Sequence, residues 1–286
     1  MKSDFFIIGL GQIGGSLALA LKKKKIARKV YGLDVRHRPE FSRILDGYVS
    51  DLEEGVKKSK VIVLATPLVE IKKFIRKIGP LMEEKQILID TGSTKREIIQ
   101  EMNKFSGRSM FGGHPMVGTV KQGPEAWNPE LFSEKPFFLC RPRHKISQES
   151  FEKIWKIIEA IGAVPLEISA TVHDQYVALT SQLPYFISLA LFSLFIKKHR
   201  CDKEIENFVA TGFLGATRLS LTAPAVGAGM VLTNQDNLVC RIEEFIKEMK
   251  CLSGLVKKKG FERKIARIYS EAEKRREFYE KAFPKN

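Results

Sequence analysis

The stretch Asp4–Lys24, which reads DFFIIGLGQIGGSLALALKKK, decides the fold of the first part of the chain. An apolar run typical of a buried strand leads into GLGQIG, which fits the pattern GxGxxG and opens a helical pattern. The first glycine permits a tight turn, the second lets the backbone approach a pyrophosphate, and the third lets the helix pack closely. Free amide groups at the helix N-terminus would face the phosphates. The segment predicts a dinucleotide-binding turn. Its cofactor-contacting residues are Gly9, Gly11, Gln12, Ile13 and Gly14.

An acidic residue at a suitable distance supports this prediction. Asp34 ends the next strand candidate, Val30–Leu33, about 20 residues further on. Its carboxylate can accept hydrogen bonds from ribose hydroxyls and repels a 2′-phosphate, which favours NAD over NADP. Arg36 and Arg38 lie just beyond it and could accommodate that phosphate, so NADP stays open as the alternative.

Short β-rich runs alternate with helical patterns over the first two thirds of the chain. The strand candidates are Asp4–Ile8, Val30–Leu33, Val61–Ala65, Ile87–Asp90, Met110–Gly113, Phe137–Cys140 and Val164–Ile168. The helix candidates between them are Ile13–Lys24, Val69–Ile78, Lys95–Lys104 and Gln148–Ile161. Continuous apolar strands separated by helices indicate a parallel sheet covered on both faces. We expect an α/β fold, with a Rossmann-type doubly wound, dinucleotide-binding sheet domain over residues 1–169 and an all-α C-terminal domain for substrate binding and dimerisation over residues 170–286.

The second domain begins with a long apolar segment, Thr171–Phe195. A helix this hydrophobic is either central to its own bundle or buried against a second subunit. The rest of the C-terminal part looks thin around it, which favours a homodimer whose helical domains share one core. Its most apolar part, Leu183–Ile196, is too short to span a bilayer comfortably, so no membrane partner is expected.

Composition excludes several classes of protein. The chain has 286 residues, 44% hydrophobic and 28% charged, which is typical of a globular protein rather than a disordered or collagen-like one. Its 48 Lys and Arg against 33 Asp and Glu give a formal net charge of +15. This excess suggests nucleic acid at first, but no recognised binding motif is present and the basic residues are scattered. We expect no nucleic-acid partner and interpret the charge as a background field that helps to steer anionic ligands.

The four cysteines, Cys140, Cys201, Cys240 and Cys251, show no CxxC and no zinc spacing. No metal site is expected, and scattered thiols indicate a reducing compartment. The apolar run near the N-terminus contains four glycines and lacks a small-residue cleavage site, so we do not expect it to be a signal peptide. The predicted location is the cytoplasm.

Three polar turns follow predicted strands at the edge of the sheet where ligands bind. Thr66-Pro67 comes first, and either lines the cofactor or only starts the next helix. DTGSTK at residues 90–95 and GGHPMVGT at residues 112–119 come next. His114 in the last turn is suited to accept a proton as hydride leaves a substrate, because the pKa of histidine lies near neutrality. The alternative is a loop histidine that caps the backbone.

GLGQIGGS, DTGSTK and GGHPMVGT, followed by VHDQYVALTSQLPY and GFLGATR, resemble prephenate dehydrogenase, as far as about Arg218. The resemblance implies conversion of prephenate to 4-hydroxyphenylpyruvate with loss of CO₂, or of arogenate to tyrosine, using NAD or NADP, in a dimer joined by the helical domains. It also implies that His114 accepts the proton of the ring hydroxyl, that Ser93 orients both this histidine and the hydroxyl, and that Arg218 binds the ring carboxylate. Ser93 could instead cap a helix, and Arg218 could form a surface salt bridge.

Further residues of the resemblance surround the substrate. Thr119 follows the histidine turn, and His173 matches a histidine of the family that is either structural or functional. Where the family usually reads SHLPH, this chain has Gln182 and Tyr185, and Tyr185 can donate a hydrogen bond but carries no positive charge. An Asp-Pro and a tryptophan of the family are also replaced, by the small residues Thr222–Gly227. These departures put the side-chain specificity in doubt.

Prephenate is the leading substrate. Arogenate carries an ammonium group on its side chain, and the missing cationic residue favours it as the alternative. A diverged dehydrogenase for another small carboxylate comes next. A regulator that binds NAD without catalysis is the last hypothesis, and the presence of both His114 and Ser93 speaks against it.

Overall fold

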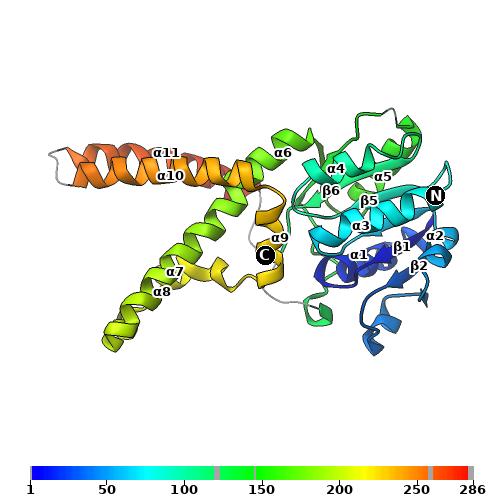
Figure 1. The fold of residues 1–286 in the computed structure, drawn as a ribbon, viewed down its shortest axis with the longest axis horizontal. Helices are drawn as coiled ribbons and strands as arrows, with labels where there is room; N and C mark the ends of the chain where they lie inside the picture. The colour runs from blue at the N-terminus through cyan, green and yellow to red at the C-terminus, as the bar shows by residue number, and fades with distance from the viewer. Residues whose placement is uncertain (1, 119–122, 145, 257–259, 283–286) are drawn as a thin grey trace. The chain divides into compact units, whose positions relative to one another are not determined.

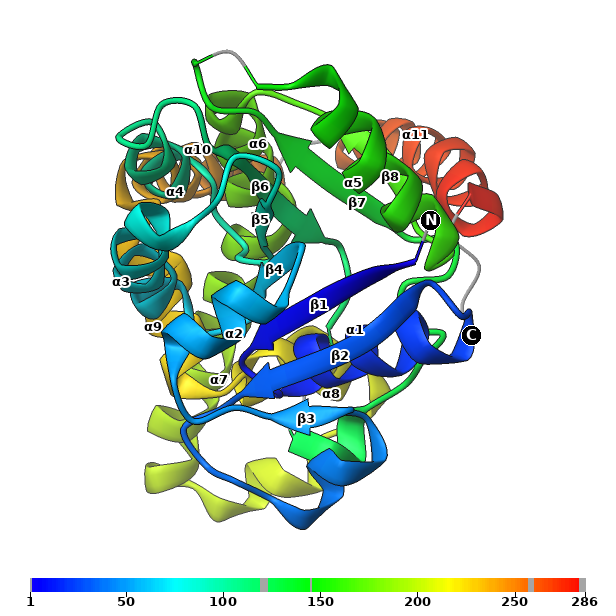
Figure 2. The same cartoon turned by 90° about the vertical axis from the view of Figure 1, so that its right-hand side faces the viewer.

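The first part of the chain forms one eight-stranded sheet between two layers of helices (Figures 1 and 2). The computed structural model describes residues 2–118, 123–144, 146–256 and 260–282. The strands run in the order β3-β2-β1-β4-β5-β6-β7-β8. Their bounds are β1 Ser3–Ile8, β2 Ala27–Leu33, β3 Gly47–Tyr48, β4 Val61–Leu64, β5 Ile87–Asp90, β6 Ser109–Pro115, β7 Pro136–Cys140 and β8 Val164–Glu167. The first six follow the order of a Rossmann sheet, whose ligands bind at the carboxyl ends of the strands where the order reverses, here between β1 and β4.

Two apolar cores cover the two faces of the sheet. Leu17 and Leu21 of α1 (Gln12–Lys23) and Ile154 of α5 (Gln148–Ala160) belong to one core. The other core takes its helical side chains from α2 (Leu52–Lys58), α3 (Leu68–Ile78) and α4 (Arg96–Met102). The prediction of a doubly wound α/β domain is therefore confirmed.

Three features of the sheet differ from the expectation. Strand β3 was not predicted because it has only two residues. Helix α2 was not predicted because its sequence, LEEGVKK, contains too few apolar residues to show a helical period. Strand β7 runs antiparallel to β6, whereas every other neighbouring pair is parallel. Strand β6 continues through His114 and Pro115, so His114 lies within the last part of the strand rather than in a turn after it.

From Ala170 onward the described chain is helical. The elements are α6 Ala170–Val177, η4 Ala178–Gln182, α7 Leu183–Cys201, η5 Lys203–Phe208, α8 Thr211–Thr217, η6 Arg218–Leu221, α9 Pro224–Leu232, α10 Gln235–Val256 and α11 Phe261–Ala282. By its contacts the chain divides into two compact units, Met1–Gln235 and Asp236–Asn286. The first contains the sheet and helices as far as α9, and the second contains nearly all of α10 and α11.

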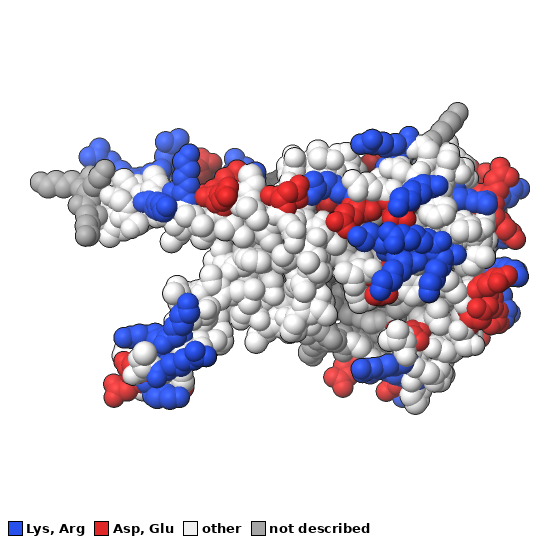
Figure 3. Space-filling model, in the orientation of Figure 1, with Lys and Arg blue, Asp and Glu red and all other residues white. Residues whose placement is uncertain are grey.

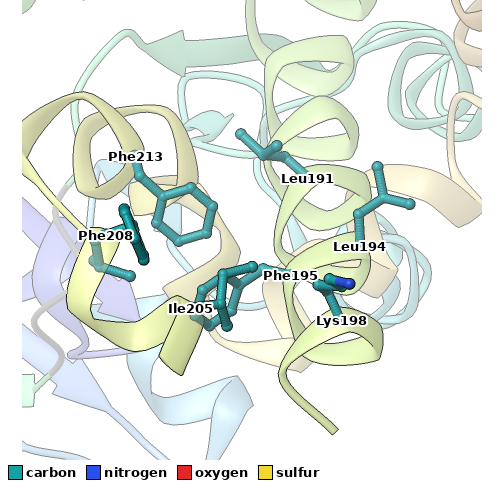
Figure 4. A pocket seen from close by; sticks show the side chains of 8 residues that line it. Leu191, Leu194, Phe195, Lys198, Ile205, Phe208 and Phe213 are labelled. Atoms are coloured by element: carbon teal, nitrogen blue, oxygen red, sulfur yellow. The ribbon is translucent and has the colours of Figure 1, made fainter. Parts of the chain in front are cut away.

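Elements α6, η4 and α7 form one continuous helix, Ala170–Cys201, that is apolar and poorly covered. Only 22% of the most apolar 18-residue stretch of this helix is buried. By length and composition alone, the helix could cross a membrane. A groove of about 350 Å³ lies between α7 and the segment that follows it (Figure 4). It is lined by Leu191, Leu194, Phe195, Lys198, Ile205, Phe208, Val209 and Phe213. Phe208 is 82% exposed. The helix is thus not buried within its own chain.

The basic side chains are distributed in small groups, many of them paired. In Figure 3 blue atoms gather over α3, which contains Lys72, Lys73, Arg76 and Lys77. Three of these form ion pairs: Lys72 with Glu97, Lys73 with Glu70, and Arg76 with Glu101. Much of this local charge is therefore already neutralised.

Candidate active site

The glycine-rich turn between β1 and α1 has the geometry of a phosphate cradle. Gly9 has a φ of +92°, and a Cβ there would lie 2.5 Å from the Ala65 carbonyl oxygen. A Cβ at Gly14 would overlap the carbonyl oxygen of Gly9. At Gly11, by contrast, no described atom lies within 4 Å of the Cβ position, so the turn is open where a pyrophosphate would approach. Gly11 is also the N-cap of α1 and has no side chain that could cap the first turn of the helix.

Asp34 lies at the edge of this turn, at the end of β2. Its Oδ2 atom accepts a hydrogen bond from the Leu10 amide at 2.7 Å, and its Oδ1 atom accepts one from the Arg36 amide at 3.1 Å. These bonds hold the carboxylate beside the turn. The remaining acceptor positions of its oxygens are available to ribose hydroxyls.

Thr66 and Trp127 complete the surroundings of the turn. The Thr66 hydroxyl is buried and has no hydrogen-bond partner among the described residues. Its methyl group lies 3.0 Å from the Cβ position of Gly9, so the threonine borders the cradle. The indole Nε1 of Trp127 donates to the Gly11 carbonyl oxygen at 3.0 Å. Trp127 occupies the space over Gly15, where a Cβ would overlap the indole. Trp127 was not predicted from the sequence. The available signal was Gly15, because a glycine at this position leaves room for a large side chain against the helix.

These observations fit a dinucleotide. Along one edge of the sheet, the open cradle could hold a pyrophosphate, and the Asp34 carboxylate could accept hydrogen bonds from a ribose. The Thr66 hydroxyl, which has no partner among the described residues, could hydrogen-bond to the same ligand. Pro67, the N-cap of α3, follows Thr66 at the same edge and is exposed.

His114 lies at the carboxyl end of β6, on the same edge of the parallel strands. Its Nδ1 atom is 2.9 Å from the Nε2 atom of His173, which belongs to α6. The other ring nitrogen, Nε2, has no hydrogen-bond partner in the part of the chain that the structure describes. The ring is half-buried, so one of its nitrogens is held and the other is available to a ligand.

Behind His114, His173 and Asp174 connect the sheet domain to α6. The Nδ1 atom of His173 donates to Oδ1 of Asp174 at 2.8 Å. The same carboxylate accepts hydrogen bonds from the backbone amides of Lys95 and Arg96, at 2.7 and 2.8 Å. These amides begin α4, so Asp174 caps that helix from another part of the chain. Both His173 and Asp174 are at most 1% exposed.

A buried ion pair lies under the strand that carries His114. Lys95 and Asp90 are fully buried, and the Lys95 ammonium contacts the Asp90 carboxylate. The ammonium also donates to the Gly113 carbonyl oxygen at 2.6 Å, and Asp90 accepts from the Gly92 and Gly113 amides at 2.7 and 3.1 Å. This pair therefore fixes the backbone next to His114 from both sides. The sequence showed Lys95 only as part of DTGSTK and did not predict its burial.

The surroundings of His114 favour its neutral form. Burial lowers the pKa of its imidazole well below the ordinary value, and the His173 ring and the Lys95 ammonium lower it further. At neutral pH the side chain is therefore unprotonated and able to accept a proton.

The remaining predicted residues lie at varied places. Ser93 is half-buried in the turn before α4, whose capping hydrogen bonds come from Asp174 rather than from a side chain of that turn. Gln182 is 1% exposed, and its Oε1 atom accepts from Asn234 at 2.9 Å, so it belongs to a buried amide pair.

The other predicted substrate residues lie in different places. Tyr185 is half-buried, with its hydroxyl next to Gly227. Arg218 is exposed on η6. Thr119 lies outside the described residues.

Within the described ranges no group of three or more His, Cys, Asp or Glu side chains is arranged to hold a metal ion.

The fold and the cradle define the class of the protein as a dehydrogenase with a Rossmann-like NAD-binding domain followed by helices. The nucleotide-binding domain model of prephenate dehydrogenase matches residues 17–167, and the dimerization domain model of the same enzyme matches residues 169–270. The chain therefore belongs to the prephenate dehydrogenase family and is an NAD-dependent oxidoreductase.

Individual relatives agree with this family. The chain is 28% identical over 256 residues to the prephenate dehydrogenase of Bacillus subtilis, covering 87% of this chain and 69% of the relative. It is 30% identical over 254 residues to the cyclohexadienyl dehydrogenase of Zymomonas mobilis, covering 86% of each. Among solved structures, prephenate dehydrogenase from A. aeolicus in complex with hydroxyphenyl propionate and NAD⁺ has the same fold. Its TM-score is 0.88, its identity is 24%, and 97% of this chain and 98% of that chain are covered.

Proposed function

We propose that the protein catalyses the NAD-dependent oxidative decarboxylation of prephenate to 4-hydroxyphenylpyruvate. The observation that carries the proposal is the arrangement of His114, whose Nδ1 atom is held by His173 and whose Nε2 atom is available at the sheet edge that carries the cofactor turn. The names of the relatives support prephenate as the substrate.

In the proposed reaction, Nε2 of His114 accepts the proton of the ring hydroxyl. NAD⁺, when bound, takes the hydride that leaves the carbon bearing this hydroxyl. The carbon–carbon bond between the ring and its carboxylate then breaks, and CO₂ leaves. The electron pair of the broken bond stays with the ring and completes its aromatic system. The proton on His114 returns to the phenolate oxygen, so that the reaction releases CO₂, reduced cofactor and a phenol. Ser93, in the turn beside this edge, is proposed to orient the hydroxyl.

Substrate binding is assigned to residues beyond the sheet. We assign the ring carboxylate to Arg218, whose guanidinium can bind it with two hydrogen bonds. Tyr185, Thr119 and Gln182 are assigned to the substrate side, and the burial of Gln182 favours an indirect contribution through the shape of the pocket. His173 is assigned to the support of His114, through the hydrogen bond between the two rings.

Arogenate is the second candidate, and two observations favour keeping it. Tyr185 stands where the family usually has a histidine, so a cationic group is missing near the substrate side chain, where arogenate carries an ammonium. One relative is a cyclohexadienyl dehydrogenase. The purified protein should be given NAD with prephenate and, separately, with arogenate, while the absorbance of the reduced cofactor is followed. A higher kcat/KM with prephenate supports the proposal, a higher value with arogenate replaces the substrate, and no reduction with either overturns it.

Cofactor choice is tested in the same assay. The position of Asp34 supports NAD, because its carboxylate would repel a 2′-phosphate. A kcat/KM at least about tenfold higher with NAD than with NADP is expected, equivalent to about 1.4 kcal/mol. Equal values would show that Arg36 and Arg38 offset this repulsion.

We also propose a homodimer in which a second copy covers the apolar face of α7. The support is the exposed apolar helix and groove, together with a match to a dimerization domain over residues 169–270. Sedimentation of the purified chain without detergent tests the dimer, and a monomer would contradict it.

We place the boundary between the two domains at residues 169 and 170. We propose the cytoplasm as the location of the protein because its four cysteines are free.

A further inference from the structure

His114, His173 and Asp174 are joined in series by hydrogen bonds. The donor and the acceptor of each bond can be assigned by starting from Asp174. An ionised carboxylate can only accept hydrogen bonds. Asp174 accepts hydrogen bonds from two backbone amides at the start of α4, so its carboxylate is held at the helix N-terminus. The ring atom that faces it, Nδ1 of His173, must therefore carry a hydrogen.

The next step assigns the proton on His114. A neutral imidazole with a hydrogen on Nδ1 has a lone pair on Nε2. Nε2 of His173 is thus an acceptor, and the atom 2.9 Å away, Nδ1 of His114, donates to it. Neutral His114 then carries no hydrogen on Nε2, which is the nitrogen without a partner among the described residues. The chain of bonds selects the one tautomer of His114 whose lone pair faces a ligand.

We propose that His173 is a positioning residue: it holds the His114 ring in the orientation set by Asp174 and fixes the tautomer of His114. This inference rests on the proposed function for its catalytic consequence, although the tautomer itself does not depend on any substrate.

The charged groups around His114 show which carboxylate is connected to its ring. Lys95, from the start of α4, donates to the carbonyl oxygen of Gly113, next to His114 in the chain, and its charge opposes an imidazolium. Asp90, from β5, is engaged by Lys95 and by the Gly113 amide. Asp174, linked through His173 of α6, is therefore the carboxylate connected to the ring itself by hydrogen bonds.

Two substitutions separate the positioning role from a structural one. His173→Phe keeps an aromatic ring beside Phe138 but removes the acceptor for His114. His173→Gln places an amide oxygen near the former Nε2 position and restores that acceptor without the link to Asp174. Asp174 keeps both backbone amides in each variant, so the cap of α4 is retained. His144→Gln, at a histidine that contacts the Arg108 carbonyl oxygen elsewhere in the domain, is the matched control.

Turnover should respond in a defined order. His173→Phe is expected to lower kcat by about 100-fold or more, within the range of general acid–base catalysis, with KM and the Kd for NAD changed less than about threefold. His173→Gln should recover about tenfold of this loss, and His144→Gln should match the parent. Equal kcat in His173→Phe and the parent, or equal losses in His173→Phe and His173→Gln, would overturn the proposal.

The tautomer is measured directly, without substrate. Long-range ¹H–¹⁵N spectra of the ¹⁵N-histidine-labelled parent distinguish a hydrogen on Nδ1 from one on Nε2, and His114→Asn assigns the signals. We expect His114 to be protonated on Nδ1 in the parent and to change or mix tautomers in His173→Phe. A parent with the hydrogen on Nε2 of His114 overturns this inference while leaving the proposed reaction to its own assay. Conversely, absence of turnover with an Nδ1–H tautomer overturns the reaction and not the chain of bonds.

Discussion

His114 Nδ1 lies 2.9 Å from His173 Nε2, and the two rings meet edge to face at an angle of 72°. This contact joins the last part of β6 to the first helix after the sheet, so it links residues of the two family domains, 17–167 and 169–270. A side chain at the sheet edge is in this way oriented by a helix that follows the sheet domain. The predictions below test the groups that surround this contact.

The glycine turn should separate cofactor binding from folding. Gly11→Ala adds a methyl group where no described atom lies within 4 Å, so the free energy of unfolding should change by less than about 1 kcal/mol while the Kd for NAD rises by about tenfold or more. Gly14→Ala would overlap the Gly9 carbonyl oxygen and should cost about 1–3 kcal/mol of stability. Calorimetry and urea unfolding measure both quantities, with Gly212→Ala in α8 as the control. An unchanged Kd in Gly11→Ala would show that the pyrophosphate does not approach there.

The buried ion pair should be important for stability. Lys95→Met leaves the Asp90 carboxylate buried without its cation, and breaking such a pair costs about 3–5 kcal/mol. Lys73→Met is the control, because the Lys73 side chain is 62% exposed and paired with Glu70 on the surface, where a pair contributes about 0–1 kcal/mol. Urea unfolding curves provide the comparison. Equal midpoints for the two variants would contradict a structural role for Lys95.

Acid should destabilise the protein partly through His114. Its pKa in the folded state lies below the ordinary 6.5, so below pH 6.5 the unfolded chain binds a proton that the folded chain does not. Stability from this group is present above pH 6.5 and is lost as the pH falls toward the folded pKa, by at most about 1.4 kcal/mol per pH unit. The free energy of unfolding of His114→Asn should therefore fall less steeply between pH 6.5 and pH 5. Parallel curves for parent and variant would show that the pKa of His114 is not lowered by folding.

Arg218 should contribute to substrate binding more than to the chemical step. Arg218→Gln removes a charge-assisted contact to a carboxylate, worth about 1.5–3 kcal/mol, so KM should rise by about 10- to 100-fold with a smaller change in kcat. Arg200→Gln, at another exposed arginine near the end of α7, should leave KM unchanged. If both variants kept the parental KM, the ring carboxylate would have to bind elsewhere.

Local patterns predicted the parts of the fold and site that depend on nearby residues. The strand, the glycine turn and Asp34 follow from steric and hydrogen-bonding needs that a short segment meets by itself. The antiparallel β7 did not follow from its sequence, because an apolar strand has the same pattern in either direction. Asp174 as the cap of α4 was equally hidden, since it lies 78 positions from Arg96, and Ser93 was the local candidate. The burial of Lys95 depends on Asp90 and Gly113 meeting it in the folded sheet.

The role of His114 as proton acceptor is tested most directly by the steady-state kinetics of His114→Asn with prephenate and NAD, alongside the parent and His144→Gln. We expect kcat to fall by about 10²–10⁴-fold, as for the loss of a general base, with the Kd for NAD unchanged because the cofactor turn is untouched. His144→Gln should keep the parental kcat. A His114→Asn enzyme with kcat near that of the parent would contradict the assignment of His114 as the group that accepts the proton.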